Sequence, residues 1–76
     1  MKRIRVDANQ SWDPDTIILR LDFPENSQYI SDDLRVGEVV TLYEPNDFEC
    51  KATVGIGRDG GWVATIIEGT IVHLTP

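Results

Sequence analysis

The sequence predicts an all-β fold: a small antiparallel barrel of about five to six strands with at most one short helical turn. Three tight-turn signals support this prediction, at Pro45-Asn46-Asp47, Asp59-Gly60 and Glu68-Gly69. Glycine, asparagine and aspartate tolerate the backbone angles of such turns, and proline presets one of them. Between the turns apolar and polar residues alternate, which is the period of a half-buried strand. Residues 36–74 are therefore predicted to form a four-stranded antiparallel meander.

The turns also predict a strand register. A three-residue loop at 45–47 pairs Leu42 with Cys50, and a two-residue loop at 59–60 pairs Ile56 with Val63. A two-residue loop at 68–69 then brings the last strand back along the third. A one-residue error at 59–60 would exchange the two faces of the third strand. With this register the inward face comprises Val40, Leu42, Cys50, Ala52, Val54, Ile56, Val63, Ile67, Val72 and Leu74.

The opposite face of the predicted meander is unusually apolar for a solvated surface. It carries Val39, Tyr43, Trp62, Ala64, Ile66, Ile71 and His73. Aromatic residues on such a face can anchor a peptide, stack on nucleic-acid bases or form a dimer contact. The candidate binding residues are therefore Trp62, Tyr43, Val39, Ile66 and Ile71. Trp62 either serves as such an anchor or is covered by residues 24–36.

The first third of the chain also contains strand patterns. Apolar residues alternate in 2–6 and again in 16–23, and we expect these two strands to form a hairpin with a long loop between them. Their apolar side should cover one face of the meander and close the barrel. Segment 24–36 could open a single helical turn at Ser31, and we expect it to cross a barrel end or the outer apolar face.

Three short motifs carry a resemblance to a known fold: Gly37-Glu38-x-Val40, Ala52-x-Val54 and Gly61-Trp62-x-Ala64. Their layout resembles the small SH3-like barrels of the KOW and Tudor kind. Those barrels have a glycine entering a strand, a bent central hairpin and an aromatic residue near its turn. The resemblance covers about half of the chain and implies a fold rather than a function. An OB barrel is the competing topology.

Composition limits the function classes. The 76 residues are expected to form one domain, 1–76, with a small core. The single cysteine excludes an internal disulfide, and with one histidine no zinc-like ligand set can be assembled. No nucleophile–base pair or cofactor loop is visible. We therefore expect no enzyme, no cofactor, no metal and no small-molecule ligand.

The favoured hypothesis is a non-enzymatic binding module that contacts a protein partner, or a second copy of itself, through the apolar face. Residues 7–49 carry eleven acidic and two basic side chains, which would steer a basic partner. The alternative is a KOW-like nucleic-acid module using Lys2, Arg3, Arg5 and Lys51 with Tyr43 or Trp62 stacking, although the net charge of −6 disfavours it. An acidic mimic that occupies a nucleic-acid-binding protein is the inverse possibility.

The sequence shows neither a membrane span nor a signal peptide, so we expect a cytoplasmic location.

Overall fold

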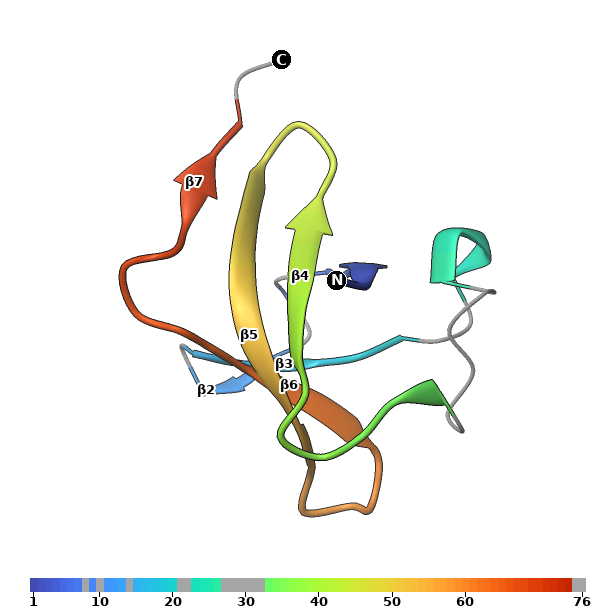
Figure 1. Ribbon diagram of the computed structural model, residues 1–76. Helices are drawn as coiled ribbons and strands as arrows, with labels where there is room; N and C mark the ends of the chain where they lie inside the picture. The colour runs from blue at the N-terminus through green and yellow to red at the C-terminus, as the bar shows by residue number, and fades with distance from the viewer. Residues whose placement is uncertain (8, 10, 14, 21–22, 27–32, 75–76) are drawn as a thin grey trace.

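The fold of the chain was analysed in a computed structural model, which describes residues 1–7, 9, 11–13, 15–20, 23–26 and 33–74. These residues form β-strands and a short 3₁₀ helix (Figure 1), so the all-β prediction is confirmed. The helical turn expected to open at Ser31 falls outside the described residues. The elements are β1 (Arg3–Arg5), β2 (Ser11–Asp13), β3 (Thr16–Ile18), η1 (Pro24–Asn26), β4 (Val39–Glu44), β5 (Phe48–Ile56), β6 (Trp62–Ile66) and β7 (Val72–His73).

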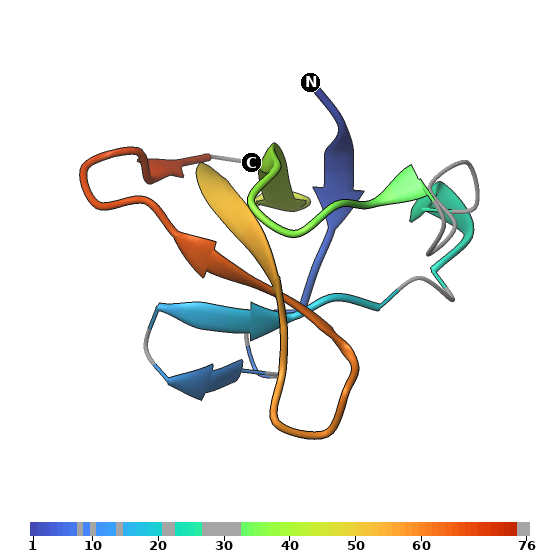
Figure 2. The same cartoon turned by 60° about the horizontal axis from the view of Figure 1, so that its bottom comes forward.

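All seven strands belong to one curved sheet, with the order β1-β4-β5-β6-β3-β2 and with β7 paired to β5. Figure 2 shows β2 and β3, in blue, turned well away from β1 and β4 on the far side of β5 and β6. Within the described residues β1 and β2 are the two ends of the strand order and do not pair with each other. The prediction of a closed barrel is therefore wrong, and the fold is an open, strongly bent sheet.

The β4–β5 hairpin forms as predicted. Leu42 lies opposite Cys50, and Glu44 lies opposite Phe48 across the three-residue loop. The loop closes with the Asp47 amide donating to the Glu44 carbonyl at 3.0 Å. Asn46 has a φ of 63°, a left-handed value that asparagine tolerates better than most residues. The turn chemistry of residues 45–47 therefore determines both the hairpin and its register.

The β5–β6 hairpin forms, but its register differs by one residue from the prediction. Ile56 lies opposite Trp62 instead of Val63. The Gly57 amide donates to the Gly61 carbonyl at 2.7 Å, so the loop contains three residues rather than two. The Asp59 carboxylate accepts a hydrogen bond from the Gly61 amide at 2.9 Å and stabilises this longer loop.

This shift exchanges the two faces of β6, because side chains alternate between the faces of a strand. Trp62 and Ile66 point to the core side and pack against it, together with the fully buried Ala64. Their assignment to the outer face is therefore wrong. Val63 points the other way and is buried opposite Gly55.

The last strand also has a different partner from the one predicted. Glu68-Gly69 forms a tight turn, but the chain then continues along β5 instead of returning along β6. His73 lies opposite Phe48 and Val72 lies opposite Glu49. The Thr70 hydroxyl holds this detour in place, because it accepts from the Lys51 amide at 3.1 Å and donates to the Ile67 carbonyl at 2.6 Å. The meander is therefore correct for three strands and wrong for the fourth.

The two N-terminal strands do not pair with each other, so the predicted hairpin is wrong. β1 lies parallel to β4, with Ile4 opposite Leu42, whereas β3 lies antiparallel to β6, with Ile17 opposite Ala64. β3 instead pairs with β2, which forms within the stretch predicted to be a loop. The alternation did identify the buried side chains correctly, since each strand contributes apolar residues to the core.

The core lies on the concave side of the sheet. Its buried apolar members are Ile4, Val6, Ile17, Leu19, Leu34, Val40, Leu42, Phe48, Cys50, Ala52, Val54 and Ala64. Four residues predicted to be core, Ile56, Ile67, Val72 and Leu74, are instead exposed by 36–57%. Three of these four follow from the altered β6 register and the altered partner of β7. Among the described residues, no helix is long and apolar enough to cross a membrane.

Candidate interaction surface

The structure does not gather the five candidate binding residues into one patch. Val39 and Tyr43 lie on the convex side of β4, where Val39 is exposed and Tyr43 is half-buried. Trp62 lies on the concave side and is half-buried against the core. Ile66 and Ile71 are the pair that the fold brings together, because both line the same groove.

This groove lies on the concave side of the sheet, and residues of β2, β3, β5, β6 and β7 contribute to its lining. Figure 2 shows β7, in red, and the β2–β3 hairpin, in blue, on either side of the end of β6. The groove has a volume of about 250 Å³. Strands β3, β5 and β6 supply the apolar part of its lining, and β7 supplies one wall. The groove is lined by Ser11, Ile17, Asp47, Phe48, Ile66, Ile71 and His73.

A second hollow adjoins the first. It has a volume of about 300 Å³ and is lined by Asp15, Ile66, Glu68, Gly69 and Ile71. Ile66 and Ile71 therefore line both depressions and form an apolar pair that the two share. Each depression lies below or at the lower end of the volumes typical of drug-sized ligand sites, about 300–1,000 Å³. The surface therefore suits individual side chains better than a large cofactor.

The segment beside the groove concentrates exposed apolar side chains. The described residues include eight large hydrophobic residues that are exposed, and half of them lie between residues 67 and 74. These four are Ile67, Ile71, Val72 and Leu74, with Ile71 exposed by 48% and Val72 by 57%. Of these four residues Ile71 lines both depressions, and an exposed apolar side chain at a depression is typical of an interaction site.

The rim of the two depressions is acidic. Asp15, Asp47 and Glu68 contribute carboxyl groups, and His73 is the one lining residue that can carry a positive charge. These carboxyl groups belong to three separate segments of the chain, which only the folded sheet brings to one surface. A ligand with apolar side chains next to basic ones would therefore match the rim in charge.

The basic residues considered for nucleic-acid contact are engaged elsewhere. The Lys2 ammonium bonds the Glu38 carboxylate at 2.6 Å, and this bond lowers the pKa of Glu38. The Arg3 guanidinium bonds the Glu49 carboxylate at 2.6 Å and also lies 4.8 Å from the centre of the Tyr43 ring. Lys51 donates to the Thr41 hydroxyl at 3.0 Å. Lys2, Arg3 and Lys51 therefore already have partners on the surface of the chain itself.

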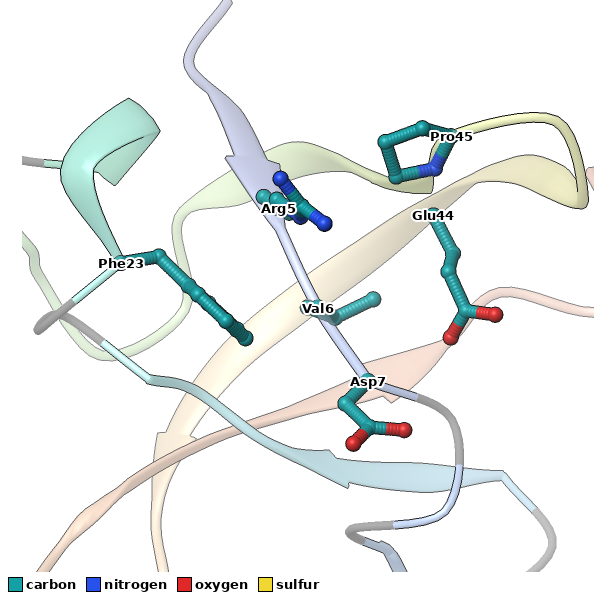
Figure 3. Close-up of a pocket in the computed structure, with 6 residues that line it drawn as sticks. All are labelled: Arg5, Val6, Asp7, Phe23, Glu44 and Pro45. Atoms are coloured by element: carbon teal, nitrogen blue, oxygen red, sulfur yellow. The ribbon is translucent and has the colours of Figure 1, made fainter.

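A separate polar hollow lies beside the end of β1 (Figure 3). It has a volume of about 360 Å³ and is lined by Arg5, Val6, Asp7, Phe23, Glu44 and Pro45. In Figure 3 Phe23 and Glu44 lie on opposite sides of Val6, with Asp7 below it. The guanidinium groups of Arg5 and Arg20 lie 5.3 and 4.9 Å from the centre of the Phe23 ring. The lining thus mixes both signs of charge and favours no single class of ligand.

Asn26, the last residue of η1, is fully buried. Its side-chain oxygen accepts from the Arg5 amide at 2.8 Å, and its side-chain nitrogen donates to the Arg5 carbonyl at 3.0 Å. The same nitrogen donates to the Arg20 carbonyl at 2.6 Å. The amide side chain therefore bonds the outer edge of β1 as a neighbouring strand would. Its role here is structural.

The single thiol and the single imidazole of the chain are those of Cys50 and His73. Cys50 is buried, and this burial raises the pKa of its thiol. His73 lies on the concave side with Phe48, which corrects its predicted place on the outer face. No cluster of three or more potential metal ligands occurs in the part of the chain that the structure describes.

The comparisons with known proteins add no further assignment. The chain matches no protein-family model, no curated protein and no solved structure. The site is therefore defined by its own geometry: an apolar groove with an acidic rim at the open side of a bent sheet.

Proposed function

We propose that the chain is a non-enzymatic interaction module that binds an apolar and basic segment of a partner protein in the groove beside β7. The observation that carries this proposal is the pairing of Ile66 and Ile71, which line both depressions. Ile71 is also exposed by 48%. Burying such side chains on binding is favourable at about 25 cal/mol per Å².

The charge of the surface favours a different protein over a second copy. The rim residues Asp15, Asp47 and Glu68 would face one another in a symmetric dimer built on this groove, because such an interface places the same patch on both subunits. Like charges at close range disfavour that arrangement. A partner segment with lysine or arginine beside its apolar side chains would instead reduce the charge of the rim.

The proposal can be tested by selecting peptides from a random display library on the folded protein. Binding of the selected peptides is then measured on Ile71→Glu and on the matched control Val39→Glu. Both residues are exposed apolar side chains, by 48% and 41%, but Val39 lies on the convex face, away from the groove. We expect Ile71→Glu to weaken binding at least about ten-fold, because it adds a charge to the apolar pair of Ile66 and Ile71. We expect Val39→Glu to leave binding unchanged.

Three results would contradict the proposal. One is a selection that enriches no peptide at all, and another is a set of peptides that bind both variants equally well. The third is a dimer of the chain that light scattering detects and that Ile71→Glu separates into monomers. That result would identify a second copy of the chain as the occupant of the groove. Unfolding curves of both variants show whether each remains folded under the assay conditions.

Two broader predictions accompany this proposal. An SH3-like relationship is supported by the bent β5–β6 hairpin with Trp62 at its turn, although the sheet is open. A cytoplasmic location is supported by the lone thiol of Cys50, which suits a reducing compartment. Neither prediction is needed for binding at the groove.

A further inference from the structure

The inference concerns the outer edge of β7. β6 and β7 lie one after the other along the same edge of β5. β3 covers the outer edge of β6, but no described strand covers the outer edge of β7. His73 of β7 lines the groove described above together with Ser11 and Ile17 of the β2–β3 hairpin. An unpaired strand edge next to an apolar groove is the arrangement used by proteins that bind an extended peptide as an extra strand.

The hydrogen bonds of β7 show which backbone groups face outward. The Leu74 amide donates to the Asp47 carbonyl at 2.8 Å, and Val72 lies opposite Glu49 in the same register. Backbone groups alternate in direction along an antiparallel strand, so those of Val72 and Leu74 face β5. The amide and carbonyl of His73, which lies between them, therefore face away from β5.

We propose that the partner segment binds as an added β-strand along the outer edge of β7, with the backbone of His73 as its hydrogen-bonding contact. This inference rests on the proposed function, since it states how the partner segment lies on the groove. It adds a backbone contact that does not depend on the partner's sequence. Side chains then determine which segment is chosen.

The added strand would present its side chains to the two depressions. In an extended segment, residues i and i+2 point to the same side and are about 6.6 Å apart. In this arrangement one such side chain lies at the groove and the other at the adjoining hollow, whose linings share Ile66 and Ile71. The residue between the two points away from the apolar floor. We therefore expect selected peptides to carry aliphatic residues at i and i+2, with lysine or arginine adjacent to them.

The test compares His73→Pro with His73→Ala. Proline removes the outward amide, and it is tolerated on edge strands when its nitrogen faces solvent. Alanine keeps the amide but removes the imidazole, so it controls for the loss of the groove-lining side chain. The probe is the selected peptide that binds wild type most tightly, synthesised with a fluorescent label. We expect His73→Pro to bind it about five-fold to ten-fold more weakly than His73→Ala, the effect of losing one net hydrogen bond and its neighbouring strand contacts.

Hydrogen exchange gives an independent readout on the wild type. When the peptide is bound, the His73 amide should exchange more slowly, whereas the Leu74 amide, which is already bonded to β5, should change much less. Equal peptide affinity of the proline and alanine variants, or an unprotected His73 amide in the complex, would overturn strand addition.

The two proposals fail in different ways. If His73→Pro binds the peptide as tightly as His73→Ala while Ile71→Glu still weakens binding, strand addition is overturned and the groove remains the binding site. If the selection enriches no peptide, or if Ile71→Glu has no effect, the proposed function itself fails, and strand addition fails with it. A variant of residue 73 that unfolds is recognised from its denaturation curve, and the exchange experiment on wild type then decides.

Discussion

Replacing Asn26 by alanine should cost a large part of the stability of this fold. The Asn26 side chain is fully buried and makes three hydrogen bonds to the backbone of Arg5 and Arg20. A typical hydrogen bond contributes about 1 kcal/mol net, so three predict a loss of about 3 kcal/mol. A domain of this size has a total free energy of unfolding of about 4–11 kcal/mol. The substitution would therefore remove between a quarter and most of it.

Urea unfolding measures this loss directly. With an m-value of about 1 kcal/mol/M for a small domain, the midpoint should fall by about 2–3 M. Asn26→Asp keeps an acceptor for the Arg5 amide but removes both donated bonds, so it should lose at least as much. Asn9→Ala, at an exposed position, is the control and should change the midpoint little. A loss below about 1 kcal/mol for Asn26→Ala would refute the idea that this side chain holds the edge of β1.

Two further predictions concern titratable groups. The hydrogen bond from Lys2 lowers the pKa of Glu38 below its ordinary value of 4.5. The stabilisation from this contact is therefore fully present above pH 4.5 and is lost as the pH falls through the pKa of Glu38 in the folded state. Glu38→Gln should therefore lower stability relative to wild type at pH 7 and much less at pH 3; a pH-independent difference in urea unfolding would contradict this. The Cys50 thiol is buried, and its pKa is raised by that burial. It should react with an aromatic disulfide reagent far more slowly in the native protein than in urea, and fast labelling of the native protein would show that the concave side opens.

Local turn chemistry explains how much of the sheet was predictable. The loop at 45–47 has a single good solution, so the β4–β5 register follows from it. Asp59-Gly60 lies between Gly57 and Gly61, and glycines on both sides permit either a two-residue or a three-residue loop. The Asp59 side chain favours the longer loop through its bond to the Gly61 amide. One residue of loop length decides which face Trp62 occupies.

Long-range pairing explains most of what was not predictable. Alternation shows that Ile4 and Ile17 are buried, but it carries no information about which strand lies beside them. The same limit applies to β7, whose tight turn was recognised but whose partner is β5 rather than β6. Thr70 determines that choice through its side-chain hydroxyl, and a threonine after Glu68-Gly69 gives no such signal in the sequence.

The candidate surface was found only in part. The predicted register places Ile66 and Ile71 on an outer face, whereas in the structure Ile66 packs on the core side and lines the groove together with Ile71. Phe48 and Ile17 look like ordinary core residues in the sequence and were not recognised as part of a groove. Asn26 gave no signal either, since an asparagine in a turn-rich segment is usually exposed.

The parallel pairing of β1 with β4 has a consequence for how the chain folds. The hairpins β4–β5 and β5–β6 join neighbouring segments and can form early. By contrast, β1 pairs with a strand that is distant in the sequence, because Ile4 lies opposite Leu42. Closing so long a loop costs entropy that is recovered only when the strand docks. We therefore expect the N-terminal strand to join last, so that the folding intermediate closest to the native state, if one is populated, exposes the β4 edge.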